Sequence, residues 1–309
     1  MITYYFRTIK DDTLKTISDL RTGVWIHAES PSDEELKALF AKLELDEALI
    51  EDAQDFYEVP RTERSENASF FFTRYPYSDG TEDVETAPLT VVMGESFVLT
   101  IVQRKIPQFD KFISGKKVVH TTQKTKFFLQ LIDQVTESYE RELVILRRNV
   151  HKDRAQLRRI GKKEIERFVT YEHKLNDMIS ALVPTNTALQ QVTKAKGSAI
   201  QLYDQDIELM EDLLIDNNQL IDSARTVLRM IQNIRTATEA ILASTLNSTI
   251  RTLTLVTILL TIPMAIASLY GMNVALPLAE AEWAFWAIVG VVVVLVGTVI
   301  VFFKRNGWF

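Results

Sequence analysis

Two apolar runs near the end of the chain limit its architecture more than any other feature. Residues 252–270 and 283–303 contain no charged side chain. Each run is close to the ~20 residues that an α-helix, rising ~1.5 Å per residue, needs to cross the ~30 Å hydrocarbon core of a bilayer. Two buried core helices are the alternative, but no residues remain after them to cover them. The sequence therefore predicts two membrane-spanning helices, at 251–270 and 283–303.

The charges that flank these runs predict their orientation. Arg251 precedes the first run, and Lys304 and Arg305 follow the second. The connection between them, 271–282, contains only acidic charges. Because basic residues stay on the cytoplasmic side, both termini are expected in the cytoplasm, with a basic tail at 304–309 and the connecting loop outside. The sequence thus predicts a multi-pass protein of the cell (inner) membrane.

Composition narrows the function classes. The chain contains no cysteine and has a formal net charge of −6. The first fact excludes disulfide frameworks and thiolate metal sites, and the second argues against nucleic acid as a partner, because phosphate binding needs a concentrated basic face. The four histidines are dispersed and no glycine-rich phosphate loop is present, so we expect neither an enzyme nor a catalytic cofactor. Cations and the lipid bilayer are the expected partners.

The part of the chain before Arg251 has the pattern of a mixed α/β domain (1–115) followed by a helical layer (116–197). Ser30 is expected to cap a helix that begins at Pro31 and runs to about residue 45. Gly94-Glu95 is expected to turn a hairpin. Short runs rich in β-branched and aromatic residues predict strands at 2–7, 24–27, 69–74, 89–92 and 96–102.

Long helices are predicted after the α/β domain. Residues 122–191 indicate helices that are interrupted near Gly161 and Pro184. Residues 198–262 contain neither glycine nor proline and have apolar residues at helical spacing, which predicts one continuous helix of about 100 Å entering the membrane. The segment 198–250 is therefore expected to be a stalk that connects the cytoplasmic body to the first span.

The first span contains a polar stripe. Asn247, Thr254, Thr261 and Ser268 recur at intervals of seven, with Thr257 close beside them. One interpretation is that Thr and Ser bond their own i−4 carbonyls and only soften the helix. The other is a polar axis shared between several copies of the chain, because two spans alone cannot enclose a water-filled path.

The first span ends in Tyr270-Gly271-Met272-Asn273. This tetrapeptide, placed after an apolar helix and before a short acidic loop, a second span and a basic terminus, resembles the CorA family of divalent-cation channels. Residues 127–139 are also similar to a helix of that family. The resemblance implies an α/β cytoplasmic domain, a long stalk helix and two transmembrane helices in a funnel-shaped homopentamer. It further implies uptake of hydrated divalent cations, magnesium foremost and also cobalt or nickel, through a pore that cytoplasmic divalent ions close.

The resemblance also assigns the site. Tyr270, Gly271, Met272 and Asn273 form the expected selectivity filter, in which neutral amide oxygens accept hydrogen bonds from the water shell that Mg²⁺ releases reluctantly. A plain helix cap is the alternative for Gly and Asn at this place. Asn247 and Leu253 coincide with a pore-facing Asn and an apolar constriction of the family. The expected pore-lining residues are Asn247, Leu253, Thr254, Thr257, Thr261, Met264 and Ser268, and the acids of the external loop are Glu280 and Glu282.

Two departures from the family pattern and two alternative functions accompany this assignment. Val274 follows the triplet where the family usually has an aromatic residue, and Thr261 stands where many members have Met. Both put the ion preference in question and keep a zinc transporter of the same superfamily as an alternative. A non-conducting membrane-anchored sensor is the alternative of another class. For regulation, Asp212 and Asp216 of the stalk are expected to bind Mg²⁺ between subunits, with an ordinary solvated acidic face as the competing interpretation.

Overall fold

The computed structural model describes residues 1–78, 84–154, 162–194, 202–273, 281 and 283–306. The chain divides into two compact units, residues 1–234 and 235–309. The first unit contains a seven-stranded sheet and the helices that cover it, and the second contains the apolar end of the chain.

The sheet has the strand order β2-β1-β3-β7-β6-β5-β4, in which β3 and β7 are parallel and the other neighbours antiparallel. The predicted hairpin at Gly94-Glu95 is confirmed, because it joins β6 to β7. The prediction missed β2 and β4, which are the two edge strands. Both are largely polar and half-exposed, so they lack the alternation that marks a strand with one buried face. The strands are β1 (Ile2–Phe6), β2 (Lys15–Ile17), β3 (Val24–Glu29), β4 (Arg61–Arg64), β5 (Ala68–Ser78), β6 (Val84–Gly94) and β7 (Phe97–Val102).

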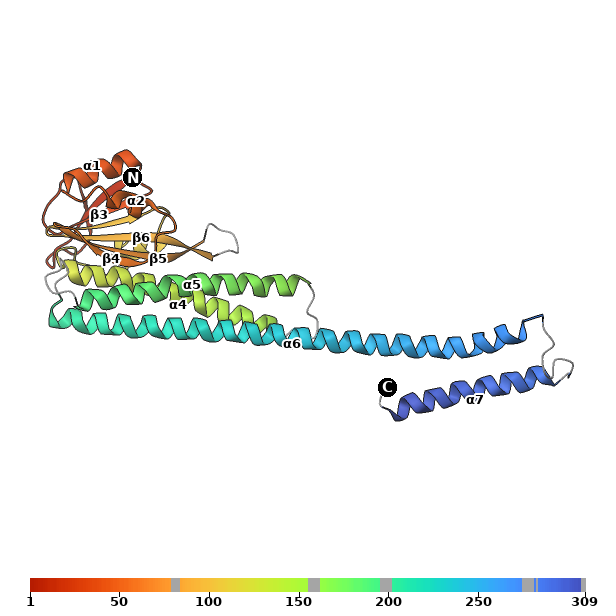
Figure 1. The fold of residues 1–309 in the computed structure, drawn as a ribbon. Helices are drawn as coiled ribbons and strands as arrows, with labels where there is room; N and C mark the ends of the chain where they lie inside the picture. The colour runs from red at the N-terminus through yellow and green to blue at the C-terminus, as the bar shows by residue number, and fades with distance from the viewer. Residues whose placement is uncertain (79–83, 155–161, 195–201, 274–280, 282, 307–309) are drawn as a thin grey trace. The chain divides into compact units, whose positions relative to one another are not determined.

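Two short helices, α1 (Asp33–Lys42) and α2 (Leu49–Gln54), cover one face of the sheet (Figure 1). The expected cap was wrong. Ser32, not Ser30, caps α1, through a capping box with Glu35, whereas Ser30 has a positive φ of 43° and ends the preceding strand segment. The expected end at residue 45 was also too late, since Glu44 has a φ of 53° and the helix stops at Lys42.

Long helices cover the other face: α4 (Lys124–Arg154) and α5 (Lys162–Lys194) follow the short η1 (Pro107–Phe109) and α3 (Asp110–Ile113) (Figure 1). Alternate residues of each strand enter different cores, because successive side chains of a strand point to opposite faces. Trp25 and Phe71 pack beneath α4 and α5, whereas Ile26 and Phe70 pack beneath α1 and α2. The expected break at Pro184 was wrong, because α5 continues through it; Gly161 lies outside the described residues.

Helix α6 (Asp204–Tyr270) confirms the continuous helix of about 100 Å that the sequence predicts. It begins at Asp204, six residues after the predicted start, of which 198–201 lie outside the described residues. Within the first unit, its apolar residues join the core beneath the sheet, among them Met210, Leu220 and Ile231. Helix α7 (Ala284–Arg305) follows in the second unit.

His27 makes the stability of the first unit depend on pH. Its ring is buried, with Nδ1 2.8 Å from Thr100 Oγ1, and this burial lowers its pKa from 6.5 to about 4. Because the unfolded state binds the proton first, the stability conferred by neutral His27 is complete above about pH 6.5 and decreases as the pH falls toward 4. We expect this loss to be roughly 2–3 kcal/mol, and His27→Gln to remove it. Denaturant unfolding in detergent from pH 7 to pH 4 measures this loss. If the free energy of unfolding fell equally with pH in the parent and in His27→Gln, the role of His27 would be contradicted.

Candidate functional site

Two described helices, α6 and α7, are long and apolar enough to cross a membrane. Hardly any of the apolar part of either helix is buried within the chain. Apolar helices that a chain leaves uncovered are stable when lipid or other copies of the chain cover them. The two predicted spans therefore coincide with the last 19 or so residues of α6 and with α7.

The predicted pore-lining residues of α6 are all exposed in the single chain. The less exposed residues of this segment lie on another face: Leu255, Ile258, Leu259, Ile262 and Ile266. At ~100° per residue, that face is centred more than about 90° away from Thr254, Thr261 and Ser268. The polar stripe therefore lies outside this half-buried face, on a side of the first span that is exposed in the single chain. The predicted pore-lining set consists of the stripe residues Asn247, Thr254, Thr257, Thr261 and Ser268 together with the apolar Leu253 and Met264.

The threonine hydroxyls of the stripe each donate their proton to a backbone carbonyl of the same helix. Thr254 donates to the Ile250 carbonyl (2.9 Å), Thr257 to that of Leu253 (2.9 Å), and Thr261 to that of Thr257 (2.7 Å). The hydrogen bonds to i−4 carbonyls, which were one interpretation of the stripe, are thus present at these three threonines. A hydroxyl has one proton and two acceptor lone pairs, so each oxygen presents only acceptors to its surroundings. A row of acceptors suits a hydrated cation, whose water molecules donate outward.

The predicted filter begins where α6 ends. The N–H of Gly271 donates to the Ala267 carbonyl (2.9 Å) and the N–H of Met272 to the Leu269 carbonyl (3.4 Å), so the backbone itself completes the last turn. Tyr270, Met272 and Asn273 are exposed. The Asn273 amide makes no hydrogen bond within the described residues and is not needed as a cap. Glu280 and Glu282 lie outside those residues.

The predicted regulatory residues lie on the first unit's part of α6. Asp212 and Asp216 are one turn apart and both exposed. Asp206, an acid nearer the start of α6, is buried instead. Its carboxylate accepts a hydrogen bond from the Tyr203 N–H at 3.2 Å, so it has a structural role at the start of this helix. No group of three potential metal-ligating side chains occurs among the described residues of this single chain.

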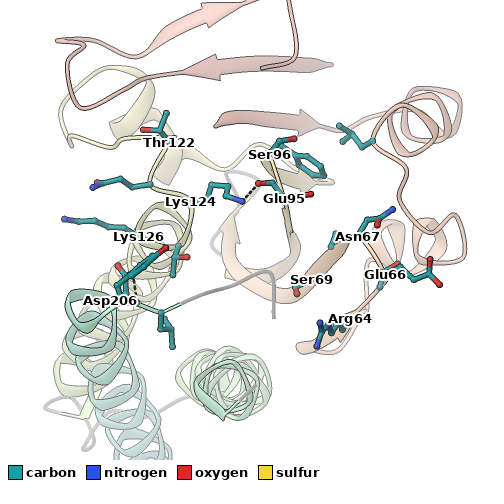
Figure 2. A pocket seen from close by; sticks show the side chains of 18 of the residues that line it. Arg64, Glu66, Asn67, Ser69, Glu95, Ser96, Thr122, Lys124, Lys126 and Asp206 are labelled. Carbon is teal, nitrogen blue, oxygen red and sulfur yellow. Dashed lines mark hydrogen bonds between the residues drawn. The ribbon is translucent and has the colours of Figure 1, made fainter. Parts of the chain in front are cut away.

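The structure also contains a cavity of about 1260 Å³ at the start of α4, which the sequence did not predict (Figure 2). Lys124 reaches into it and donates to the carbonyls of Gly94 (2.8 Å) and Glu95, and burial lowers the pKa of this lysine. Arg64 and Lys126 also line it. The acids of its lining outnumber these bases: Glu44, Glu66, Glu95, Asp204 and Asp206.

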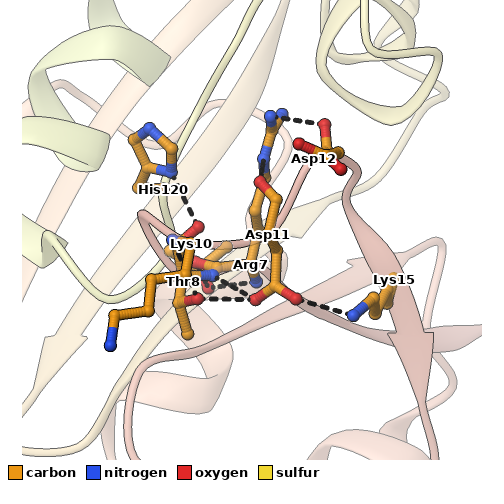
Figure 3. Close-up of polar contacts among 8 residues, drawn as sticks. Arg7, Thr8, Lys10, Asp11, Asp12, Lys15 and His120 are labelled. Atoms are coloured by element: carbon orange, nitrogen blue, oxygen red, sulfur yellow. Dashed lines mark hydrogen bonds and ion pairs between the residues drawn. The ribbon is translucent and has the colours of Figure 1, made fainter.

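A polar cluster ties the turn after β1 to the segment before α4 (Figure 3). Arg7 donates to the carbonyls of Asp11 (3.1 Å) and Asp12 (2.6 Å), and His120 Nδ1 lies 3.1 Å from the Thr8 carbonyl. Hydrogen bonds from Lys15 and Thr8 hold the pKa of Asp11 well below its usual range. Its hydrogen bonds join two segments that are far apart in the sequence, so we assign it a structural role.

These features define an integral membrane protein with a large α/β and helical body before its two spans. A sequence model of the CorA-like Mg²⁺ transporter protein family matches residues 21–305, and the chain belongs to this family. It is therefore a membrane transporter for divalent cations and not an enzyme.

Curated and solved relatives agree with this assignment. The chain is 28% identical over 292 residues to the cobalt/magnesium transport protein CorA of Methanocaldococcus jannaschii, covering 92% of this chain and 91% of the relative. It is 22% identical to the magnesium transport protein CorA of Campylobacter jejuni, with the same coverage. The complete structure of the M. jannaschii CorA magnesium transporter superposes with a TM-score of 0.88 at 24% identity, over 100% of this chain and 99% of that one, and confirms the predicted fold.

Proposed function

We propose that this chain forms a homopentameric channel for the uptake of hydrated Mg²⁺, with α6 of each copy lining the pore and α7 outside. The observation that carries the proposal is the exposed polar stripe of α6. Its threonine hydroxyls donate to their own helix and so offer only acceptors to their surroundings, and these threonines are exposed in the single chain. In a ring of copies these oxygens face one axis, where the water shell of a divalent cation donates to them.

The filter is formed by Asn273 of each copy, at the external mouth of the pore. A ring of neutral amide oxygens binds the ion's water molecules without displacing them, so the ion enters and leaves rapidly. Gly271 lets the chain leave the helix axis there, and Tyr270 and Met272 hold the ring. The acids Glu280 and Glu282 attract cations to the mouth. Both termini are in the cytoplasm, and the protein lies in the cell (inner) membrane.

Flux into proteoliposomes across a panel of Mg²⁺, Co²⁺, Ni²⁺ and Zn²⁺, reported by ion-sensitive dyes, tests this function. We expect Mg²⁺ uptake that follows the membrane potential and saturates, with Co²⁺ and Ni²⁺ also carried. Uptake of Zn²⁺ in preference to Mg²⁺ would identify a zinc transporter instead. No flux of any of the four ions through folded, pentameric protein would identify a non-conducting sensor.

Cytoplasmic Mg²⁺ closes the pore by bridging Asp212 and Asp216 between neighbouring copies. Both carboxylates are exposed and one turn apart on α6, so an adjacent subunit can share an ion with them. We expect Asp212→Asn with Asp216→Asn to raise the half-inhibiting Mg²⁺ concentration about thirtyfold, since each of the two lost charged contacts weakens binding by roughly 1 kcal/mol.

Inhibition of current by Mg²⁺ on the cytoplasmic side measures this effect. The matched control is Asp222→Asn with Glu239→Gln, which removes the same charge from exposed positions of the same helix. Equal inhibition of the parent and of the Asp212/Asp216 variant would refute the role of these two acids.

A further inference from the structure

Several side-chain hydrogen bonds gather around a proline inside helix α5. Pro184 has no N–H, so the Ser180 carbonyl loses its helical donor and the ladder is open at this turn. The next three carbonyls each accept a side-chain hydrogen bond. These bonds are Thr185 Oγ1 to Ala181 O (2.8 Å), Asn217 Nδ2 to Leu182 O (3.2 Å) and Thr187 Oγ1 to Val183 O (3.2 Å).

One of these donors, Asn217, belongs to α6, and a second amide bond joins the same two helices. Asn186 Nδ2 donates to Asn218 Oδ1 at 3.0 Å. The orientation of Asn218 is fixed, because its own Nδ2 donates to the Leu214 carbonyl at 2.8 Å. Asn186 must therefore direct its nitrogen toward α6, and Asn217 must direct its nitrogen toward α5.

This arrangement gives two buried oxygens no donor among the described residues, namely Oδ1 of Asn186 and Oδ1 of Asn217. The side chains are only 8% and 1% exposed. A buried acceptor without a donor destabilises the fold, and an apolar side chain of similar volume would pack here without that penalty. A buried polar group that reduces stability can have another role, which is to fix the rotation of one packed helix relative to another.

The other side of α5 is fixed to the sheet at the same turn. The hydroxyls of Thr73 on β5 and Thr185 on α5 lie 2.9 Å apart, and both side chains are buried. Hydrogen bonds thus run from the sheet through the Pro184 turn of α5 into α6. The exposed acids Asp212 and Asp216 lie on this stretch of α6, and Asp216 directly precedes Asn217.

We infer that Asn186, Asn217 and Asn218 form a polar latch that fixes the rotational setting of α6 against α5 at Pro184. The latch sets the Mg²⁺ concentration at which transport stops, because an ion held by Asp212 and Asp216 acts on the turn of α6 that the latch holds. Asn217 is a positioning residue here, since it touches no ion. The inference rests on the gating proposed above.

Full-length protein in proteoliposomes or planar bilayers tests the latch. We expect Asn217→Leu to shift the half-inhibiting Mg²⁺ concentration about tenfold while the thermal unfolding midpoint stays equal or rises. Asn218→Leu, which breaks only the second bond, should shift it in the same direction. Asn233→Leu is the control, because Asn233 is an exposed Asn on the same helix. If Mg²⁺ inhibited the parent and Asn217→Leu at the same half-inhibiting concentration, the latch would be overturned.

A distance measurement separates the latch from the gating proposal. The chain has no cysteine, so Gln190→Cys on α5 and Gln219→Cys on α6 place two spin labels at exposed positions. In pentamers assembled from doubly labelled chains diluted with excess unlabelled chains, we expect one narrow distance distribution with Mg²⁺ in the parent and a broadened one in Asn217→Leu. Identical distributions in both proteins would overturn the latch. A parent whose flux ignores cytoplasmic Mg²⁺ would instead overturn the gating proposal.

Discussion

Asn273→Ala is expected to reduce Mg²⁺ uptake about tenfold or more without unfolding the protein. Each amide oxygen that is lost removes a contact to the ion's water shell worth roughly 1 kcal/mol, and the loss recurs in every copy around the axis. Stability should not change, because the N–H groups of Gly271 and Met272 already complete the last turn of α6 without help from this side chain. Initial uptake rates and thermal unfolding of the same preparations measure both expectations.

The matched control is Asn306→Ala. Asn306 follows the end of α7, and its backbone N–H bonds the Phe302 carbonyl at 3.1 Å, so it is a second Asn at the end of a spanning helix with no part in the filter. Asn273→Asp adds a test of the chemistry, because a ring of carboxylates should bind divalent ions more tightly and discriminate less by hydration. If Asn273→Ala lowered stability and left flux unchanged, Asn273 would be a helix cap.

Replacing Thr254 and Thr261 together by Val is expected to reduce flux by about thirtyfold. Valine keeps the shape of threonine and removes the oxygen, so two acceptors are lost from each copy along the proposed pore, each worth roughly 1 kcal/mol. Ion uptake at saturating and limiting Mg²⁺ measures the change.

The control for this pair is Thr298→Val in the second span. Thr298 makes the same i−4 bond, to the Val294 carbonyl at 2.7 Å, but belongs to α7. We expect it to leave flux within about twofold of the parent. Equal losses in Thr298→Val and in the Thr254/Thr261 variant would mean that these hydroxyls serve only the helix backbone.

Much of the fold follows from local signals. The two spans follow from the length and apolarity of their runs, and the stalk from helical spacing without glycine or proline, all of which a single sequence shows. The edge strands β2 and β4 were missed because charged residues occupy them. The sequence predicted a break at Pro184, but α5 continues through it, because a proline inside a helix has a local cost that the packing of the helix can offset.

The candidate site was predictable in its position but not in its assembly. The heptad spacing identified the stripe, and the structure adds that it lies away from the half-buried face marked by Ile258 and Ile262. Predicting the cap at Ser32 would have required knowing which of the two nearby serines, Ser30 or Ser32, bonds with Glu35. The amides of Asn186 and Asn217 gave no signal, since a polar residue inside a helical pattern reads as solvent-facing until its neighbours are known.

The central claim is that several copies gather the polar faces of their first spans around a water-filled axis. Cysteines introduced one at a time at 253–270 of this cysteine-free chain, treated with a charged thiol reagent during flux, test it most directly. We expect reaction and block of flux at Thr254, Thr261 and Ser268, and protection at Ile258, Ile262 and Ile266. Protection of the stripe, or reaction centred on the Ile258 face, would contradict it.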